Sequence, residues 1–278
     1  MAIGTKVLTF GGSKVGTVGE NKLMGWDIYL QAKNFISVAN ITDPTQITAI
    51  NYLVKELVDN NLIGKFNFIY PMVGGDATKH SYNLIDTGLY RLTFNGGWTH
   101  SANGATPNGA NAWGNTNCNA QILGNTNNVH LSYYSRTDTA PGYAISMGVN
   151  IGGLPTLALR IKEAIDGRAY AFFANSVTNQ PFFNSVTGTT LFMANTTSPT
   201  SRQLIRNGIV LNQNTVNEVY SAPNGNIYIG AYNLNGTAAA FDNKQCAFAS
   251  GGQGLTSGEI TIFNNIVQQY QTKLGRNV

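Results

Sequence analysis

Short runs of alternating apolar and polar residues, separated by turn residues, make up most of the chain from Tyr90 onward. Over 129–134 this alternation predicts a half-buried strand. Further strands are expected at 144–149, 156–161, 169–173, 190–193, 202–206, 209–211 and 227–231. Asn207 and Gly208 form the strongest hairpin signal among them. Only stacked sheets bury so many alternating faces, so the sequence predicts a mainly β, antiparallel β-sandwich of the jelly-roll type.

Two amphipathic helices are expected beside the sandwich, the first at 44–59. Asp43 is a good N-cap residue, and the side chain of Gln46 is expected to reach back to it as in a capping box. The apolar residues of this segment recur at helical spacing and give one buried stripe.

The second helix is expected at 257–274. Thr256 and Glu259 have the spacing of a capping box, and Gly275 supplies a C-terminal stop. We expect the two helices to pack together against one flank of the sandwich, because each has a single apolar stripe to bury.

The first forty residues differ from the rest of the chain. Lys6–Phe10 and Trp26–Leu30 are β-prone runs between glycine turns, with too little apolar mass to fold alone. The sequence therefore predicts a β-rich N-terminal arm at 1–40, used for attachment or oligomerisation, and a jelly-roll domain at 41–278.

Charge and targeting signals exclude several classes of protein. Charged residues make up 11% of the chain, and the basic residues behind the net charge of +4 are scattered singly. Nucleic-acid binding is therefore not expected. The start of the chain lacks the apolar core of a signal peptide, and no apolar run is long enough to span a bilayer, so neither a signal peptide nor membrane insertion is expected.

The two cysteines, Cys118 and Cys246, lie far apart in the sequence and match no metal-binding spacing. They form either one disulfide or two buried thiols.

The stretch from Tyr70 to Asn119 is rich in Gly, Asn, Trp and His and almost free of charge. Its motifs are YPMVGGD at 70–76, KHSYNL at 79–84, RLTFNGGWTH at 91–100 and PNGANAW at 107–113. Further motifs towards the C-terminus are IYIGAY at 227–232, CAFAS at 246–250 and KLGR at 273–276. Together they resemble the signature of laminin-G-like or concanavalin A-like jelly-roll domains of bacteriophage and prophage virion proteins, over about 41–278.

This resemblance implies a structural virion protein, such as a fibre, spike or decoration subunit. Its expected partners are other virion proteins, further copies of itself (a trimer, by the habit of such fibres) and a host-surface glycan. The expected location is the virion, after synthesis in the host cytoplasm. A secreted carbohydrate-binding module or lectin is the alternative.

Enzyme and metal sites are not indicated. A retaining glycosidase needs two carboxylates about 5 Å apart, but the nearest such pair, Glu163 and Asp166, falls at an expected turn. A glycoside hydrolase is therefore the weaker alternative, and we expect no enzymatic activity and no cofactor. The spacings of His80, His100 and His130 match no zinc motif, so no metal site is expected.

The aromatic segment around residue 100 is the candidate ligand site. Sugar recognition needs flat aromatic faces and planar amides. The segment offers both, in Trp98, His100, Asn108, Asn111 and Trp113. A structural alternative stays open, because Trp98 could plug the sandwich core and Asn-Gly pairs are common turn formers.

Overall fold

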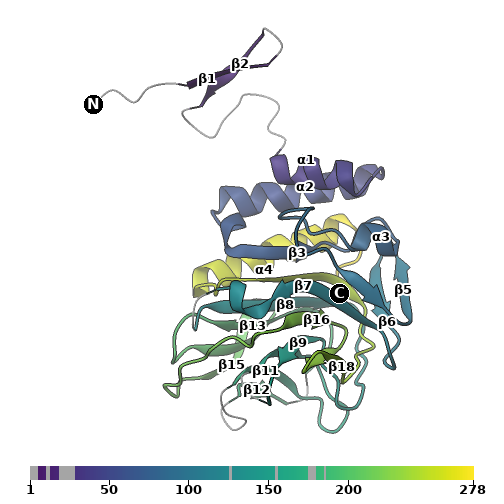
Figure 1. Cartoon of the computed structure of the whole chain (residues 1–278), viewed down its shortest axis with the longest axis vertical. Coiled ribbons are helices and arrows are strands. Elements are labelled where there is room, and N and C mark those ends of the chain that lie inside the picture. Colours follow the sequence, from purple (N-terminus) through teal and green to yellow (C-terminus); the bar gives the residue numbers. More distant parts are fainter. Residues whose placement is uncertain are drawn as a thin grey trace.

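The computed structural model describes residues 6–10, 13–18, 29–124, 127–153, 156–174, 180–184 and 186–278. Two β-sheets pack face to face, and helices cover the outer surface of one of them (Figure 1). Among the described residues the strand pairs are antiparallel, apart from one parallel pair that joins a short strand to the middle of the second sheet. The predicted mainly β sandwich with flanking helices is confirmed.

The sheet beneath the helices is called here the covered sheet. Its eight strands run in the order β15–β14–β13–β8–β19–β6–β5, with β3 beside β19. Their bounds are β3 (Phe66–Tyr70), β5 (Trp98–Ser101), β6 (Gly104–Pro107), β8 (Val129–Ser135), β13 (Thr190–Thr196), β14 (Arg202–Arg206), β15 (Ile209–Asn214) and β19 (Cys246–Gly252). The expected hairpin joins β14 to β15, where Asn207 and Gly208 both have the positive φ of a type I′ turn.

The second sheet, called here the open sheet, has nine strands in the order β12–β11–β10–β9–β16–β7–β4, with the β17–β18 hairpin beside β9. Their bounds are β4 (Thr93–Asn95), β7 (Trp113–Asn119), β9 (Met147–Asn150), β10 (Thr156–Arg160), β11 (Ala169–Ala174), β12 (Phe182–Phe183), β16 (Asn226–Ile229), β17 (Tyr232–Leu234) and β18 (Thr237–Ala239).

The covered sheet is buried on both faces. Every residue of β8 is buried, so the prediction of a half-buried strand there was wrong. Val129, Leu131 and Tyr133 point into the core between the sheets, whereas Tyr134 packs under the helices. His130 and Ser132 occupy the helix side and bond to Ser250 on the neighbouring strand β19. Polar residues therefore still alternate with apolar ones in the sequence.

Helices α2 (Pro44–Asp59) and α4 (Ser257–Lys273) lie side by side on the covered sheet, as expected (Figure 1). The predicted capping box of α4 is present. That of α2 is only half formed: Asp43 accepts from the backbone of Gln46, but the Gln46 side chain accepts from Gly74 N at 2.8 Å. Gln46 therefore holds the loop after β3 rather than its own helix start.

A further helix, α1 (Leu30–Val38), was not predicted. The sequence predicts that Leu30 ends a β-prone run of the arm, whereas in the structure it begins a helix whose Ala32 and Phe35 are buried against α2. Burial of these two side chains outweighs weak local signals, since no side chain caps the helix. Strands β1 (Lys6–Phe10) and β2 (Ser13–Val18) pair as a hairpin, while most of Trp26–Leu30 lies outside the described residues.

Both cysteines are free and buried in the core between the sheets. Burial raises the pKa of each thiol to about 12. Of the two alternatives left by the sequence, the structure has two inert thiols rather than a disulfide.

Arg276 joins the end of α4 to both the loop after β3 and the strand β19. Its side chain is fully buried. The guanidinium donates to Gln271 Oε1 (2.6 Å) and to the carbonyls of Met72 (2.7 Å), Pro71 (2.8 Å), Ala247 (2.8 Å) and Ala102 (3.3 Å). Backbone dipoles thus take the place of an acidic partner, and the fork of donors fixes four chain segments at one point.

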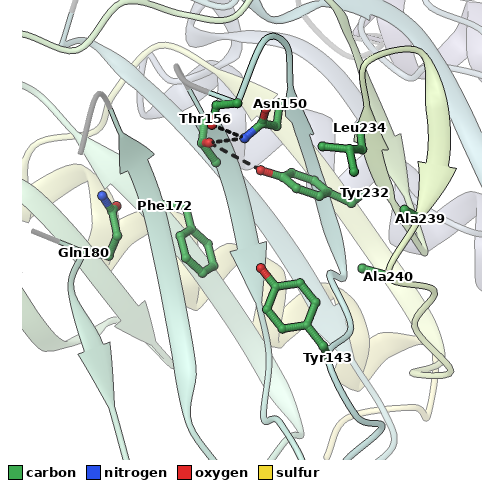
Figure 2. A pocket seen from close by; sticks show the side chains of 10 residues that line it. Tyr143, Asn150, Thr156, Phe172, Gln180, Tyr232, Leu234, Ala239 and Ala240 are labelled. Atoms are coloured by element: carbon green, nitrogen blue, oxygen red, sulfur yellow. Dashed lines mark hydrogen bonds between the residues drawn. The ribbon is translucent and has the colours of Figure 1, made fainter. Parts of the chain in front are cut away.

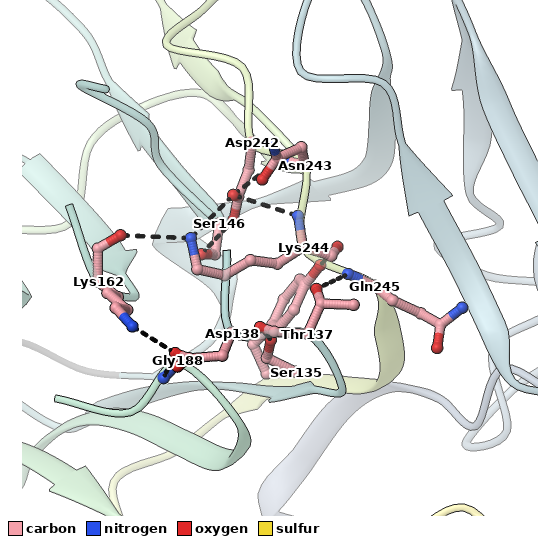
Figure 3. Close-up of polar contacts among 11 residues, drawn as sticks. Ser135, Thr137, Asp138, Ser146, Lys162, Gly188, Asp242, Asn243, Lys244 and Gln245 are labelled. Carbon is pink, nitrogen blue, oxygen red and sulfur yellow. Dashed lines mark hydrogen bonds and ion pairs between the residues drawn. The ribbon is translucent and has the colours of Figure 1, made fainter. Parts of the chain in front are cut away.

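A buried ion pair fixes the crossing from the open sheet to the covered sheet (Figure 3). Asp242 and Lys244, between β18 and β19, are both fully buried, with Lys244 Nζ 3.2 Å from Asp242 Oδ1. The second oxygen of Asp242 accepts from Ser146 Oγ at 2.6 Å, just before β9. Burial lowers the pKa of Lys244. With no exposed atom, this group has a structural role.

We expect Arg276→Met to lower the free energy of unfolding by about 2–4 kcal/mol, because buried carbonyls would lose their donors. Urea denaturation measures the difference. Lys273→Met, one turn earlier on an exposed position, is the matched control and should change stability by less than about 0.5 kcal/mol. Equal losses in the two variants would contradict the role assigned to Arg276.

Candidate functional site

The amides of Asn108 and Asn111, two of the predicted ligand contacts, are already bonded within their own loop. Asn108 Oδ1 accepts from the backbone of residues 110, 111 and 112. Asn111 Oδ1 accepts from Asn108 Nδ2 at 2.8 Å and from Gly97 N at 3.1 Å. These bonds shape the turn between β6 and β7, so both amides have the structural use that the sequence left open.

Trp98 and His100, on β5, pack inward at the edge of the sandwich. Trp98 lies against Gly230, where a Cβ atom would come within 2.8 Å of Trp98 Cη2. Phe94 contacts both side chains edge-on. His100 Nδ1 lies 2.9 Å from His80 Nδ1. Trp98 is half-buried and packed on the core, in line with the plug that the sequence left as an alternative.

Trp113, the last of the five predicted contacts, points the other way. It lies on the outer face of the open sheet, where its ring packs against Tyr228 with centroids 4.4 Å apart and the ring planes tilted by 33°. The structure therefore divides the predicted site between a core-facing group and one outward aromatic ring. Glycan contact by these residues stays a prediction.

The three histidines do not meet. His80 pairs with His100, but His130 lies under the helices, with Nδ1 2.6 Å from the carbonyl of Gln253 and Nε2 3.3 Å from Ser250 Oγ. A carbonyl only accepts, so Nδ1 of His130 carries the proton and Nε2 accepts. Within the described ranges, no three His, Cys, Asp or Glu side chains are grouped as a metal site.

The outer face of the open sheet carries a pocket of about 590 Å³ (Figure 2). Its lining consists of Tyr143, Asn150, Gly153, Thr156, Phe172, Gln180, Tyr232, Leu234, Ala239 and Ala240. Strands β9, β10 and β11 supply one side and the β17–β18 hairpin the other. In Figure 2 the rings of Phe172, Tyr232 and Tyr143 surround the pocket, with Asn150 and Thr156 at one end.

The polar end of the pocket is held by three side chains. Asn150 Nδ2 donates to Thr156 Oγ1 at 2.8 Å, and the Tyr232 hydroxyl donates to the same oxygen at 3.4 Å. Burial raises the pKa of Tyr232, so its hydroxyl stays protonated at neutral pH. These bonds fix the orientation of the Tyr232 ring.

Alternation along the hairpin separates this pocket from a neighbouring one. Tyr232 and Leu234 line the first pocket, whereas Asn233 and Asn235 line a second, of about 500 Å³, beside Tyr228. Successive strand residues face opposite sides. The same four-residue segment therefore serves an aromatic pocket and an amide-rich one.

The first pocket has the composition of a small-molecule binding site rather than of an acid–base active site. Aromatic faces, amides and a hydroxyl line it, and none of its lining residues is a carboxylate. Glu163 and Asp166 form the expected turn, where Gly167 N donates to the Glu163 carbonyl at 3.1 Å. Asp166 pairs with Arg168 at 2.6 Å. Stacking and hydrogen bonding to a polar ring are what this arrangement supports.

Sequence reasoning missed the pocket, although one signal was present. In β11 the inward residues Ala169, Ala171 and Phe173 belong to the core, yet the outward residues Tyr170 and Phe172 are aromatic too. A strand with one solvated face should carry polar residues there. Aromatic side chains on both faces indicate that the outer face has something to bind or cover.

No protein-family model matches the chain, and no curated protein matches it. Among solved structures, it is similar to domain 4 of the arabinanase AbnA of Geobacillus stearothermophilus, in complex with arabinotriose, with a TM-score of 0.47 and 11% identity over 72% of this chain and 98% of that one.

Two further solved structures are similar. For the CBM40 of the Ruminococcus gnavus IT-sialidase, bound to α2,3-sialyllactose, the TM-score is 0.37 at 13% identity over 51% of this chain and 83% of that one. For a mutant of Trypanosoma rangeli sialidase the TM-score is 0.46 at 12% identity, over 82% of this chain and 39% of the sialidase chain. The last match covers well under half of the sialidase. At such TM-scores these likenesses carry no argument about function.

The histidines make stability depend on pH. Burial lowers the pKa of His130 to about 4, and burial with the neighbouring His100 and Arg276 lowers that of His80 to about 3. The unfolded chain binds these protons near pH 6.5, before the folded chain does. Stability contributed by the neutral rings is therefore complete above pH 6.5 and is lost as the pH falls towards 4 and 3.

We expect each of these two histidines to lower the free energy of unfolding by up to about 1.4 kcal/mol per pH unit below pH 6.5. Urea denaturation at pH 7 and pH 5 measures this loss. The control is the double variant His80→Gln, His130→Gln, in which the loss between the two pH values should shrink. An unchanged loss in that variant would assign the acid sensitivity to other groups.

Proposed function

We propose that this chain is a carbohydrate-binding protein whose binding site is the pocket on the outer face of the open sheet. The observation that carries the proposal is that three aromatic side chains, Phe172, Tyr143 and Tyr232, surround a pocket that also has amide and hydroxyl groups in its lining. Sugars present apolar ring faces and polar edges, and this combination of surfaces matches both.

Exposure of the face supports this choice. The helices occupy the outer side of the covered sheet, so the open sheet has the exposed β-surface of the sandwich (Figure 1). Tyr143 is 68% exposed at the rim, although an aromatic ring of its size normally buries most of its area. A large exposed ring at the rim of a pocket is available for contact with a ligand.

We further propose that the domain is displayed on a virion, as the sequence resemblance implies, with residues 1–40 serving for attachment or oligomerisation. Repeated copies would turn a shallow, weak site into strong attachment through effective concentration. This part of the proposal is supported by the motifs at 70–113 and 227–276.

Replacement of Phe172 tests the site. Phe172→Leu keeps apolar volume but removes the flat ring, so we expect binding to weaken about three- to tenfold with little change in stability. A glycan array, including arabinotriose and α2,3-sialyllactose, finds the ligand, and calorimetric titration measures the affinity.

Trp113→Ala is the matched comparison, because Trp113 lies on the same face outside this pocket. Affinity should survive that change. Binding that is lost with Trp113→Ala and kept with Phe172→Leu would move the site to the segment first predicted from the sequence.

Removal of residues 1–28 tests the role of the arm. We expect the full chain to form oligomers and the shortened chain, which keeps α1, to be monomeric. Light scattering measures both masses, and thermal unfolding shows whether the shortened chain is folded. A folded shortened chain with the same mass as the full chain would rule out oligomerisation through these residues.

A further inference from the structure

Arg160 lies directly beside the proposed sugar-binding pocket, and its side chain does not point into the core between the sheets. It projects from β10 on the outer face of the open sheet, since its neighbours Leu157 and Leu159 point into the core. Its Cζ atom lies 3.9 Å from the ring centroid of Tyr143 and 5.3 Å from that of Phe172, and both rings line the pocket. The ring centroid of Tyr170, on the neighbouring strand, lies 5.0 Å from the same atom, and among these three rings Arg160 is only 4% exposed.

The hydrogen bonds of Arg160 leave one edge of its guanidinium unused. Nη1 donates to Glu163 Oε2 at 2.7 Å, whereas the buried Nε and Nη2 have no partner among the described residues. Those two N–H groups point in the same direction, along the edge that binds a carboxylate side-on through two parallel hydrogen bonds. Buried, unpartnered donors on a charged group are costly, and native structures rarely keep them without a use.

We propose that the pocket binds sugars that carry a carboxylate, and that Nε and Nη2 of Arg160 take this carboxylate when the Tyr143 ring turns aside. The inference rests on the proposed sugar-binding function and names its ligand class. Tyr143 is 68% exposed, so turning it aside gives up mainly its contact with the guanidinium, whereas Glu163, Tyr170 and Phe172 still contact Arg160.

The surrounding charges favour a carboxylate over a hydroxyl. None of the residues that line the pocket is acidic. Glu163 bonds to Nη1, away from the free edge, and the nearby Asp166 is paired with Arg168. A hydroxyl also accepts from arginine, but only a carboxylate brings a negative charge and two oxygens that match Nε and Nη2 in two parallel hydrogen bonds.

The test compares each sugar acid with its own methyl ester. Calorimetric titration of the full chain uses oligosaccharides that end in glucuronate, galacturonate or a nonulosonate, each as free acid and as ester. We expect one of the acids to bind at least about tenfold more tightly than its ester, since the ester loses the charge but keeps the ring.

Two variants assign the preference to Arg160. Arg160→Lys keeps the charge but not the two-pronged edge, so the preference should fall below about threefold. Arg206→Lys, on the covered sheet, is the control and should keep it, because Arg206 also has an unpartnered Nε but lies away from the pocket. If Arg160→Lys does not fold, Glu163→Gln replaces it, and acid binding should then tighten because a like charge is removed.

The outcomes separate this inference from the proposed function. Equal binding of acid and ester, weakened by Phe172→Leu, would overturn the carboxylate inference and keep the sugar pocket. An acid-over-ester preference that is unchanged in Arg160→Lys would also overturn the carboxylate inference. So would an affinity for the acid that is unchanged in Glu163→Gln. No binding of any sugar on the array or in titration would overturn both.

Discussion

Burial of both faces of the covered sheet is the constraint on which the rest of the structure depends. One face meets the open sheet, and the other requires a second apolar layer, which α2 and α4 supply. Without that layer, Tyr134, Phe248 and their neighbours would be exposed to water on a wide apolar surface. The helices therefore belong to the sandwich. Because they take up one side, any binding surface built on strands has to form on the other.

The chain uses few charges, and several of those it has are placed inside. Arg276 is held by carbonyls, Lys244 by Asp242, and Arg160 by Glu163 and aromatic rings. A buried charge costs desolvation free energy and stabilises the fold only when its bonds are well satisfied. By that measure Arg276 and Lys244 are structural residues. Of these three, Arg160 is the exception, because two of its donors have no partner among the described residues.

Much of the fold was predictable because local and tertiary signals agree. The caps at Asp43 and Thr256 and the turn at Asn207 mark their elements correctly, since each residue bonds or bends as its chemistry dictates. Helix α1 was missed because tertiary contacts stabilise it, above all those with α2, and no side chain caps it. The full burial of β8 was missed because alternation reports polarity, and polar residues are tolerated inside when strands or helices satisfy them.

The candidate site was harder to predict, for a geometric reason. Asn108 and Asn111 have the right chemistry for a sugar contact, but both amides also bond within or beside the turn they form, and the sequence does not show which use applies. The pocket instead gathers Tyr143, Phe172 and Tyr232 from separate strands and loops. Their proximity follows from the strand order of the open sheet, which single-sequence patterns do not encode.

The position of Arg276 has a consequence for how the protein is made. Its guanidinium bonds to Pro71 and Met72, more than two hundred residues earlier in the chain, and to Ala102 and Ala247. During synthesis the carbonyls of Pro71, Met72 and Ala102 emerge from the ribosome long before their donor does. The sheets can pair before Arg276 is made, but the hydrogen bonds from its guanidinium form only after nearly the whole of this sequence has been synthesised. Packing of the helical layer is therefore completed only after residue 276 has been translated.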